Sequence, residues 1–379
     1  MTLHSKRPRL AMYLYIFAAT LLNLSAHAEE KKAADLLTRV PEAPAASALD
    51  ISRTENSPPS VMRRLSFELL NNDEATGFAA ETSPYLVYLN LRYAPENPDR
   101  YLSVDDYQTS PWTRTLANIN LSAAAVRSGG DKGDRAAIAL RWTIFNRGDI
   151  YNDRELYNAA DKTGCVVDAI DSIELPPPPA TDTESDHDVI SHSDELEKAL
   201  GKCISEAEKR NWNSTSLQLS AVQLWNSPGE GLSDLAPAGQ RYMLVGSYGF
   251  EEWGGLRDRS QLLVNIGYGE NVRFVDSDGN ASRRDETRAG LRLRVAPTKA
   301  SGRDFNISAE ANYSKNNYTN ASKDQNEWTY RIGAEWRVAD SLWLSVTGED
   351  RSGDEIAGDE QRVGLQLRWA INDKATFDS

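Results

Sequence analysis

The sequence predicts an all-β protein: an antiparallel transmembrane β-barrel of about 12 strands, with a partly helical insert between strands 4 and 5. Two observations support this. Short segments alternate apolar and polar residues with the period of two that strands require, and their polar positions are rich in Arg and Glu. Many apolar faces also end in Trp or Tyr. Both features are expected of a wall with lipid outside and water inside.

The last candidate strand shows the pattern most clearly. Its polar face carries Arg362 and Arg368, whereas a soluble sandwich does not usually place charge at so many of these positions. An arginine facing lipid would cost roughly 2 to 4 kcal/mol near the midplane, so its regular placement fixes which face points inward. The apolar face consists of Val363, Leu365, Leu367, Trp369 and Ile371.

The amino terminus predicts export. A basic start is followed by an apolar stretch over residues 10–24 and by the small residues Ala26 and Ala28, the pattern of a cleavable signal peptide over 1–28. The alternative is a membrane anchor, but the stretch is shorter than the roughly 20 residues that a spanning helix needs. We therefore expect localisation in the cell outer membrane.

Composition and cysteine usage agree with that compartment. Without the three basic residues of the leader, 39 Lys and Arg face 56 Asp and Glu, a net charge of −17 that argues against nucleic acid as a partner. The two cysteines, Cys165 and Cys203, are expected to form a disulfide in an oxidising periplasm. A metal site is disfavoured, because neither has a second ligand at suitable spacing.

The chain divides into five parts. Residues 29–61 predict a disordered periplasmic lead, 62–371 the barrel, and 372–379 a C-terminal tail. The segment 147–213 interrupts the barrel with a Pro run, an acidic stretch and a helix; it could hang in the periplasm, bind a partner there, or plug the lumen. Strands are predicted over 64–71, 79–93, 115–127, 134–146, 214–225, 240–251, 259–269, 286–296, 303–314, 326–338, 341–349 and 360–371.

Alternation also assigns side chains to the two faces of the wall. Aromatic residues near the strand ends are expected to form interfacial girdles, among them Tyr93, Trp142, Trp328, Trp336 and Trp369. The opposite face either forms a cationic lumen that favours anions or cross-links a narrow interior through Arg and Glu. Its predicted lining is Arg92, Arg141, Arg288, Arg292, Arg294, Arg331, Arg337, Arg362, Arg368, Glu310 and Glu335.

These segments, notably Glu286–Val295 and Gln361–Ile371, resemble the outer-membrane β-barrels of Gram-negative bacteria over residues 64–371. The resemblance is to a porin-like class and not to one family. It implies contact with outer-membrane lipid and lipopolysaccharide. The favoured function is a porin-like channel for passive passage of small solutes, with a lean to anions. The alternative is a non-conducting barrel that serves envelope assembly, export or interaction, with 147–213 binding a periplasmic protein.

An enzyme is not expected. The histidines outside the leader, His187 and His192, lie in the acidic insert without a neighbouring strand to position them as a base. We predict no catalytic residue, cofactor or metal, and the oligomeric state stays open.

Overall fold

A computed structural model gives the architecture of the chain. Statements about structure concern the residues it describes, namely 33–36, 42–49, 65–71, 75–94, 97, 100–128, 134–172, 186–227, 235–250, 258–275, 281–298, 304–318, 325–339, 342–353, 360–370 and 373–376.

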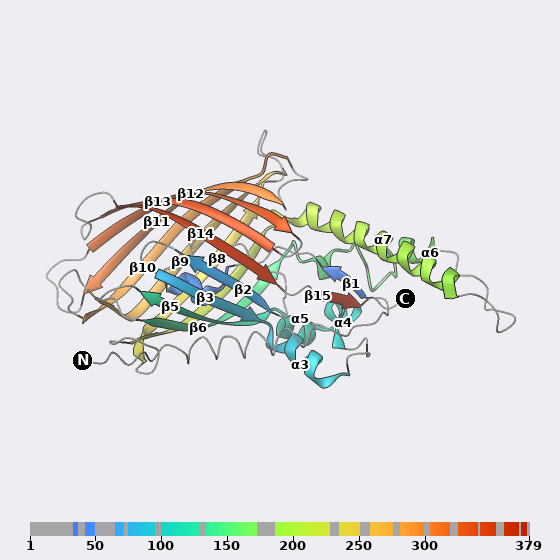
Figure 1. Cartoon of the computed structure of the whole chain (residues 1–379), viewed down its shortest axis with the longest axis horizontal. Helices are drawn as coiled ribbons and strands as arrows, with labels where there is room; N and C mark the ends of the chain where they lie inside the picture. The colour runs from blue at the N-terminus through green and yellow to red at the C-terminus, as the bar shows by residue number, and fades with distance from the viewer. Residues whose placement is uncertain are drawn as a thin grey trace, which may run out of the picture.

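The chain folds into a closed antiparallel barrel of 12 strands, which confirms the predicted fold class (Figure 1). Neighbours along the chain pair with each other, and β14 pairs with β2 to close the cylinder. The strands are β2 (Ser66–Asn71), β3 (Ala75–Thr82), β5 (Ile119–Ser128), β6 (Arg135–Asn146), β7 (Ser216–Asn226), β8 (Ala236–Gly249), β9 (Ser260–Val275), β10 (Ala281–Val295), β11 (Phe305–Tyr318), β12 (Gln325–Ala339), β13 (Leu342–Gly353) and β14 (Glu360–Ala370).

The second predicted strand, 79–93, is wrong over most of its length. Strand β3 ends at Thr82, and Pro84–Arg92 forms helix α3. Proline is well suited to the first turn of a helix, where its missing N–H costs nothing. The apparent alternation through Leu89 and Leu91 belongs to a helix that buries Leu86 and Leu89 and exposes Leu91.

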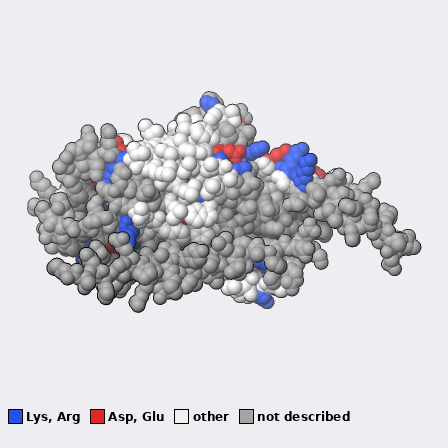
Figure 2. Space-filling view, viewed as in Figure 1, with Lys and Arg blue, Asp and Glu red and all other residues white. Residues whose placement is uncertain are grey.

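The wall separates apolar from polar side chains as predicted. On β6, Arg141 is buried inside while Trp142, next to it, is exposed outside. Ile332 on β12 is 74% exposed between inward-facing neighbours such as Arg331. Figure 2 shows the middle of the barrel as a broad patch without charged residues, with Lys, Arg, Asp and Glu at both ends of it. The outer surface therefore suits hydrocarbon, and the interior suits water and charge.

The outward position of Leu291 gives a direct prediction. Its side chain is 53% exposed on β10, so Leu291→Arg should destabilise the folded barrel by about 2 to 4 kcal/mol in lipid. The change is measured as a fall in the urea midpoint of folded, heat-modifiable protein. Leu291→Ala is the control and should lose much less. Equal losses in both variants would contradict a lipid-facing position.

One end of the barrel carries a second folded unit, which we call the end module. It is built from two insertions, 84–118 between β3 and β5 and 147–215 between β6 and β7. Among the described residues, no helix combines the length and apolarity that a membrane crossing requires. The further elements of the module are β4 (Leu102–Ser103), α4 (Val104–Thr109), α5 (Pro111–Ala117), η4 (Ile150–Asn152), α6 (Cys165–Asp171) and α7 (Asp186–Asn211).

The two insertions share one hydrophobic core. Tyr107 of the first and Tyr151 of the second are both buried, with ring centroids 5.3 Å apart. The Tyr107 hydroxyl donates to the buried Asp149 carboxylate and accepts from Asn118 at 2.7 Å. The 147–213 insert is therefore part of a packed unit at the mouth of the barrel.

Segments from the amino-terminal and carboxyl-terminal parts of the chain, 33–36 and 373–376, also join this module. Strand β1 (Ala33–Leu36) pairs with β15 (Asp373–Thr376), which pairs in parallel with β4. The lead over 29–61 was predicted to be disordered, and this needs correction at 33–36 and 42–49: the first is a strand and the second is buried.

The predicted disulfide is present between α6 and α7. Cys165 and Cys203 are bonded across 38 residues of sequence. By the loop-entropy model, Cys165→Ser with Cys203→Ser should destabilise the end module by about 4 kcal/mol. Limited proteolysis should then cleave the module earlier while the barrel keeps its heat-modifiable mobility. An unchanged cleavage rate would contradict this result.

Candidate functional site in the barrel lumen

A short piece of the amino-terminal chain lies inside the barrel. We call Glu42–Leu49 the lumen segment; it contains helix α2 (Pro44–Ala48), all five residues of which are buried. It begins beside Arg368, near the module end of β14, and Ala48 lies beside Arg241, further along the lumen. The segment thus runs lengthwise from the module end towards the opposite mouth.

Polar groups of the wall hold the backbone of the lumen segment. The Ala43 N–H donates to the Glu68 carboxylate at 3.1 Å, and the Ala45 N–H donates to the Ser122 hydroxyl at 3.2 Å. Arg141 donates to the Glu42 carbonyl at 3.3 Å, and Arg241 donates to the Ala48 carbonyl. Each such bond contributes about 1 kcal/mol, and those to charged groups up to about 3 kcal/mol. The segment is therefore anchored at both ends.

Small side chains make room for the segment. Alanines at positions 43, 45, 46 and 48 pack against inward alanines of the wall, including Ala79 on β3, Ala124 on β5 and Ala137 on β6. Val222, Leu224 and Val272 complete an apolar cluster inside a lumen that is otherwise polar. Close packing of this kind leaves no room for water between the helix and this side of the wall.

The rest of the interior is a network of arginines and glutamates. Arg331 donates to Glu349 at 2.6 Å and to Glu310 at 3.1 Å, and so links three neighbouring strands. Glu286 forms ion pairs with Arg241 at 2.5 Å and with Arg288 at 3.2 Å. Most lumen arginines therefore have an acidic partner, as expected of cross-links within a narrow barrel.

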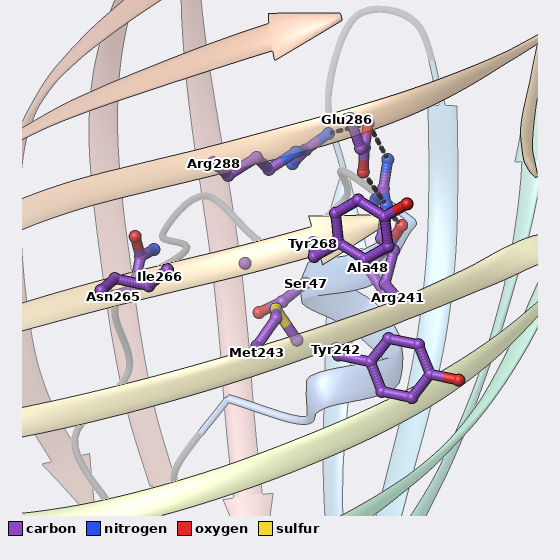
Figure 3. Close-up of a pocket in the computed structure, with 11 residues that line it drawn as sticks. Ser47, Ala48, Arg241, Tyr242, Met243, Asn265, Ile266, Tyr268, Glu286 and Arg288 are labelled. Atoms are coloured by element: carbon purple, nitrogen blue, oxygen red, sulfur yellow. Dashed lines mark hydrogen bonds and ion pairs between the residues drawn. The ribbon is translucent and has the colours of Figure 1, made fainter. Parts of the chain in front are cut away.

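Space remains beside the end of α2 and towards the mouth opposite the module. One hollow lies between Ser47 and Ala48 of the lumen segment and the wall residues Arg241, Met243 and Arg288 (Figure 3). Its empty space, open solvent included, is about 350 Å³. A second and more polar hollow, with about 420 Å³ of empty space that includes open solvent, lies towards the mouth opposite the module. Its charged lining consists of four arginines and one glutamate: Arg284, Arg288, Arg331, Arg351 and Glu327.

The predicted lumen arginines other than Arg92 lie on the inward face of their strands. Arg141 is paired with Glu81, and Arg292 lies 3.9 Å from Glu310. Arg294 donates to Gln261 at 2.6 Å. Arg368 is fully buried and pairs with Glu335 at 2.9 Å. Arg337 pairs with Asp304 at the rim, Arg288 with Glu286 and Arg331 with Glu310, and Arg362 lies opposite Glu349 in the strand register.

Arg92 and Tyr93 are corrections. Both lie at the end of helix α3, outside the barrel, because the chain turns helical after Thr82. Arg92 donates to the Tyr88 hydroxyl at 3.0 Å, and Tyr93 packs against the module core. The other predicted girdle residues, Trp142, Trp328, Trp336 and Trp369, lie on the outward face; Trp328 stacks on Tyr330 and Trp369 on Phe67.

The lumen segment itself was missed, together with the wall residues that hold it. The segment 42–49 is short and has no alternation of charged and apolar residues. Its sequence therefore does not predict that it lies inside a barrel. The usable signal is on the wall. Inward alanines at 79, 124, 137 and 139 leave a gap on adjacent strands that another part of the chain must fill.

No family model matches the sequence, and no curated protein sequence matches it either. Solved structures similar to it include the NanC porin, at 8% identity and a TM-score of 0.36 over 81% of this chain and 98% of that one. The KdgM porin in complex with disordered oligogalacturonate has 6% identity, a TM-score of 0.34, and coverage of 81% and 98%. OpdK from Pseudomonas aeruginosa has 7% identity and a TM-score of 0.32, over 82% of this chain and 67% of that one. At these scores we take nothing about function from them.

Proposed function

We propose that the protein is an outer-membrane, porin-like channel for passive passage of small solutes. The observation that carries the proposal is a closed wall, apolar outside and charged inside, that still leaves a polar hollow towards the mouth opposite the module. A barrel of 12 strands lies between those that side chains fill and those that conduct freely. The width of the path is then set by what occupies the lumen.

The lining of the larger hollow favours anions. Four arginines and one glutamate line it, so a small anion entering from the mouth opposite the module meets more positive than negative charge. Carboxylates reduce this excess at each of the four arginines. Glu286 pairs with Arg284 and Arg288, and Glu310 and Glu349 pair with Arg331. Glu349 also pairs with Arg351. We therefore expect a modest preference and not exclusion of cations.

Planar-bilayer recording tests the channel and its preference together. Purified protein should give conductance steps, and a KCl gradient should give a reversal potential on the anion side. Arg284→Gln should move that potential towards zero. Ser282→Gln, on the same strand, is the matched control and should leave it in place. If neither the wild type nor a variant without the lumen segment gives conductance steps, the proposal of a channel is overturned.

A non-conducting barrel is the second candidate, and the end module favours it. That module has its own buried core and disulfide, which a simple pore does not need. The first and last residues of the barrel wall, Ser66 and Ala370, pair at the end that carries the module. Both ends of a bacterial barrel normally lie on the periplasmic side, so we infer that the module lies in the periplasm. In this alternative its surface binds a periplasmic protein and the lumen segment is a permanent filling.

A further inference from the structure

Helix α3 of the end module has apolar side chains on two opposite faces. Leu86 and Leu89 point into the module core and are buried. Tyr88 and Leu91, on the other side of the helix, are 51% and 75% exposed, and Val87 lies beside them. A surface helix usually carries polar residues on its solvent side, so this second apolar face calls for an environment other than water.

Helix α5 extends the same surface. Trp112 is 78% exposed and Leu116 is 44% exposed, and their spacing of four residues puts them on one side of the helix. The two helices lie against each other, and both contact β5. Figure 1 shows them directly at the module end of β3, β5 and β6.

This surface continues the lipid-facing wall. Strand β5 starts two residues after α5, and its outward-facing Leu121 is 40% exposed. Ile119, at the start of β5, pairs with Trp142, an outward-facing aromatic on β6. The exposed apolar residues of α5 therefore lie next to the part of the barrel that meets the membrane.

The flanking residues suit the boundary between hydrocarbon and headgroups. Tyr88 and Trp112 have the amphipathic rings that gather at that depth. Arg92 lies over the Tyr88 ring at 5.8 Å and donates to its hydroxyl, which places a guanidinium at the edge of the apolar surface. Figure 2 shows uncharged residues and blue basic atoms together at this lower edge of the module. Basic residues beside Trp and Leu are the composition of helices that lie in the membrane interface.

We propose that α3 and α5 insert their exposed apolar side chains into the phospholipid leaflet that borders the module, and so hold the module against the membrane. Anionic lipid phosphates are the groups that Arg92 would meet. A leaflet is favoured over a protein partner because the surface is continuous with a wall that lipid already covers. The proposal depends on the barrel spanning a bilayer and does not depend on whether it conducts.

Quenching by brominated lipids tests the proposal. The protein is reconstituted into vesicles of phosphatidylethanolamine and phosphatidylglycerol whose acyl chains carry bromine near the headgroup or near the chain end. The emission of Trp112 is obtained by subtracting the spectrum of Trp112→Phe. We expect quenching by the shallow bromines comparable with that of the wall residue Trp328, obtained from Trp328→Phe, and weaker quenching by the deep bromines.

The controls separate this inference from the membrane assignment. Trp212 lies 5.6 Å from the Arg294 guanidinium, towards the lumen, and should be quenched by neither lipid. Quenching of Trp328 without quenching of Trp112 would overturn the inference and keep the barrel in the bilayer. Loss of both would overturn both. A dimer in detergent that Leu91→Glu dissociates would overturn it in favour of self-association.

Discussion

Deletion of residues 43–49 should convert the barrel into a more open pore. The deletion removes helix α2 from between the inward alanines of β3, β5 and β6, and water and ions take its place. Single-channel steps in planar bilayers should then be several-fold larger than those of the wild type. The variant should keep its heat-modifiable mobility, because the 12 wall strands do not include the segment.

A covalent lock provides the matched control. The Ala45 N–H lies 3.2 Å from the Ser122 hydroxyl, so Ala45→Cys with Ser122→Cys can bond the lumen segment to β5. The locked barrel should stay at or below the wild-type conductance, and a reductant should restore the wild-type level. The wild type in the same reductant corrects for loss of the native disulfide. Equal conductance of the wild type, the deletion and the lock would show that the segment does not restrict the path.

Arg368→Ala should be the most destabilising single change in the lumen. Its guanidinium is fully buried and joins Glu335 at 2.9 Å, Glu42 at 3.8 Å and the Ser345 hydroxyl at 3.0 Å. Truncation leaves these carboxylates inside the barrel without their common cation, which typically costs about 3 to 5 kcal/mol. Urea unfolding followed by gel mobility and Trp fluorescence measures the loss. Because Glu42 starts the lumen segment, conductance should also rise.

A second variant shows whether the loss arises from uncompensated charge. Arg368→Met combined with Glu335→Gln and Glu42→Gln removes the charges on both sides and keeps similar volume. Removing both signs of charge together leaves no uncompensated charge inside the barrel, so stability should return most of the way to the wild type. Loss as large as in Arg368→Ala would contradict uncompensated charge as the cause of the destabilisation.

The wall was predictable because its physics is local. Alternation with arginine on one face and Trp or Leu on the other is enough to place β6, β12 and β14 within a few residues. Several strands extend further than predicted: β9 continues to Val275, and β10 starts at Ala281. Polar and apolar residues do not separate cleanly between the two faces in these extensions, so the pairing of the strands continues without a clear periodic signal.

The misses come from contacts between distant parts of the chain. Alternation alone could not distinguish strand from helix at 84–92, where Pro84 and the burial of Leu86 and Leu89 in a core shared with the other insertion decide for helix. The position of Glu42–Leu49 depends on Arg141, Arg241 and Arg368, which are 99 or more residues away in sequence. Ion-pair partners such as Glu349 for Arg331 depend on strand register, which a single strand does not reveal.

Spin-label accessibility across the wall tests the whole account most directly. The native cysteines are bonded to each other, so single cysteines introduced at Leu291, Ile332 and Leu365 and at the inward-facing Thr329 and Gln366 take the label alone. In proteoliposomes the labels at Leu291, Ile332 and Leu365 should collide with oxygen, which dissolves in hydrocarbon, and should be shielded from a water-soluble nickel chelate. The labels at Thr329 and Gln366 should be shielded from the oxygen in the hydrocarbon. Outward labels that reach the chelate, or are shielded from both reagents by protein, would contradict a barrel with lipid outside and a polar lumen within.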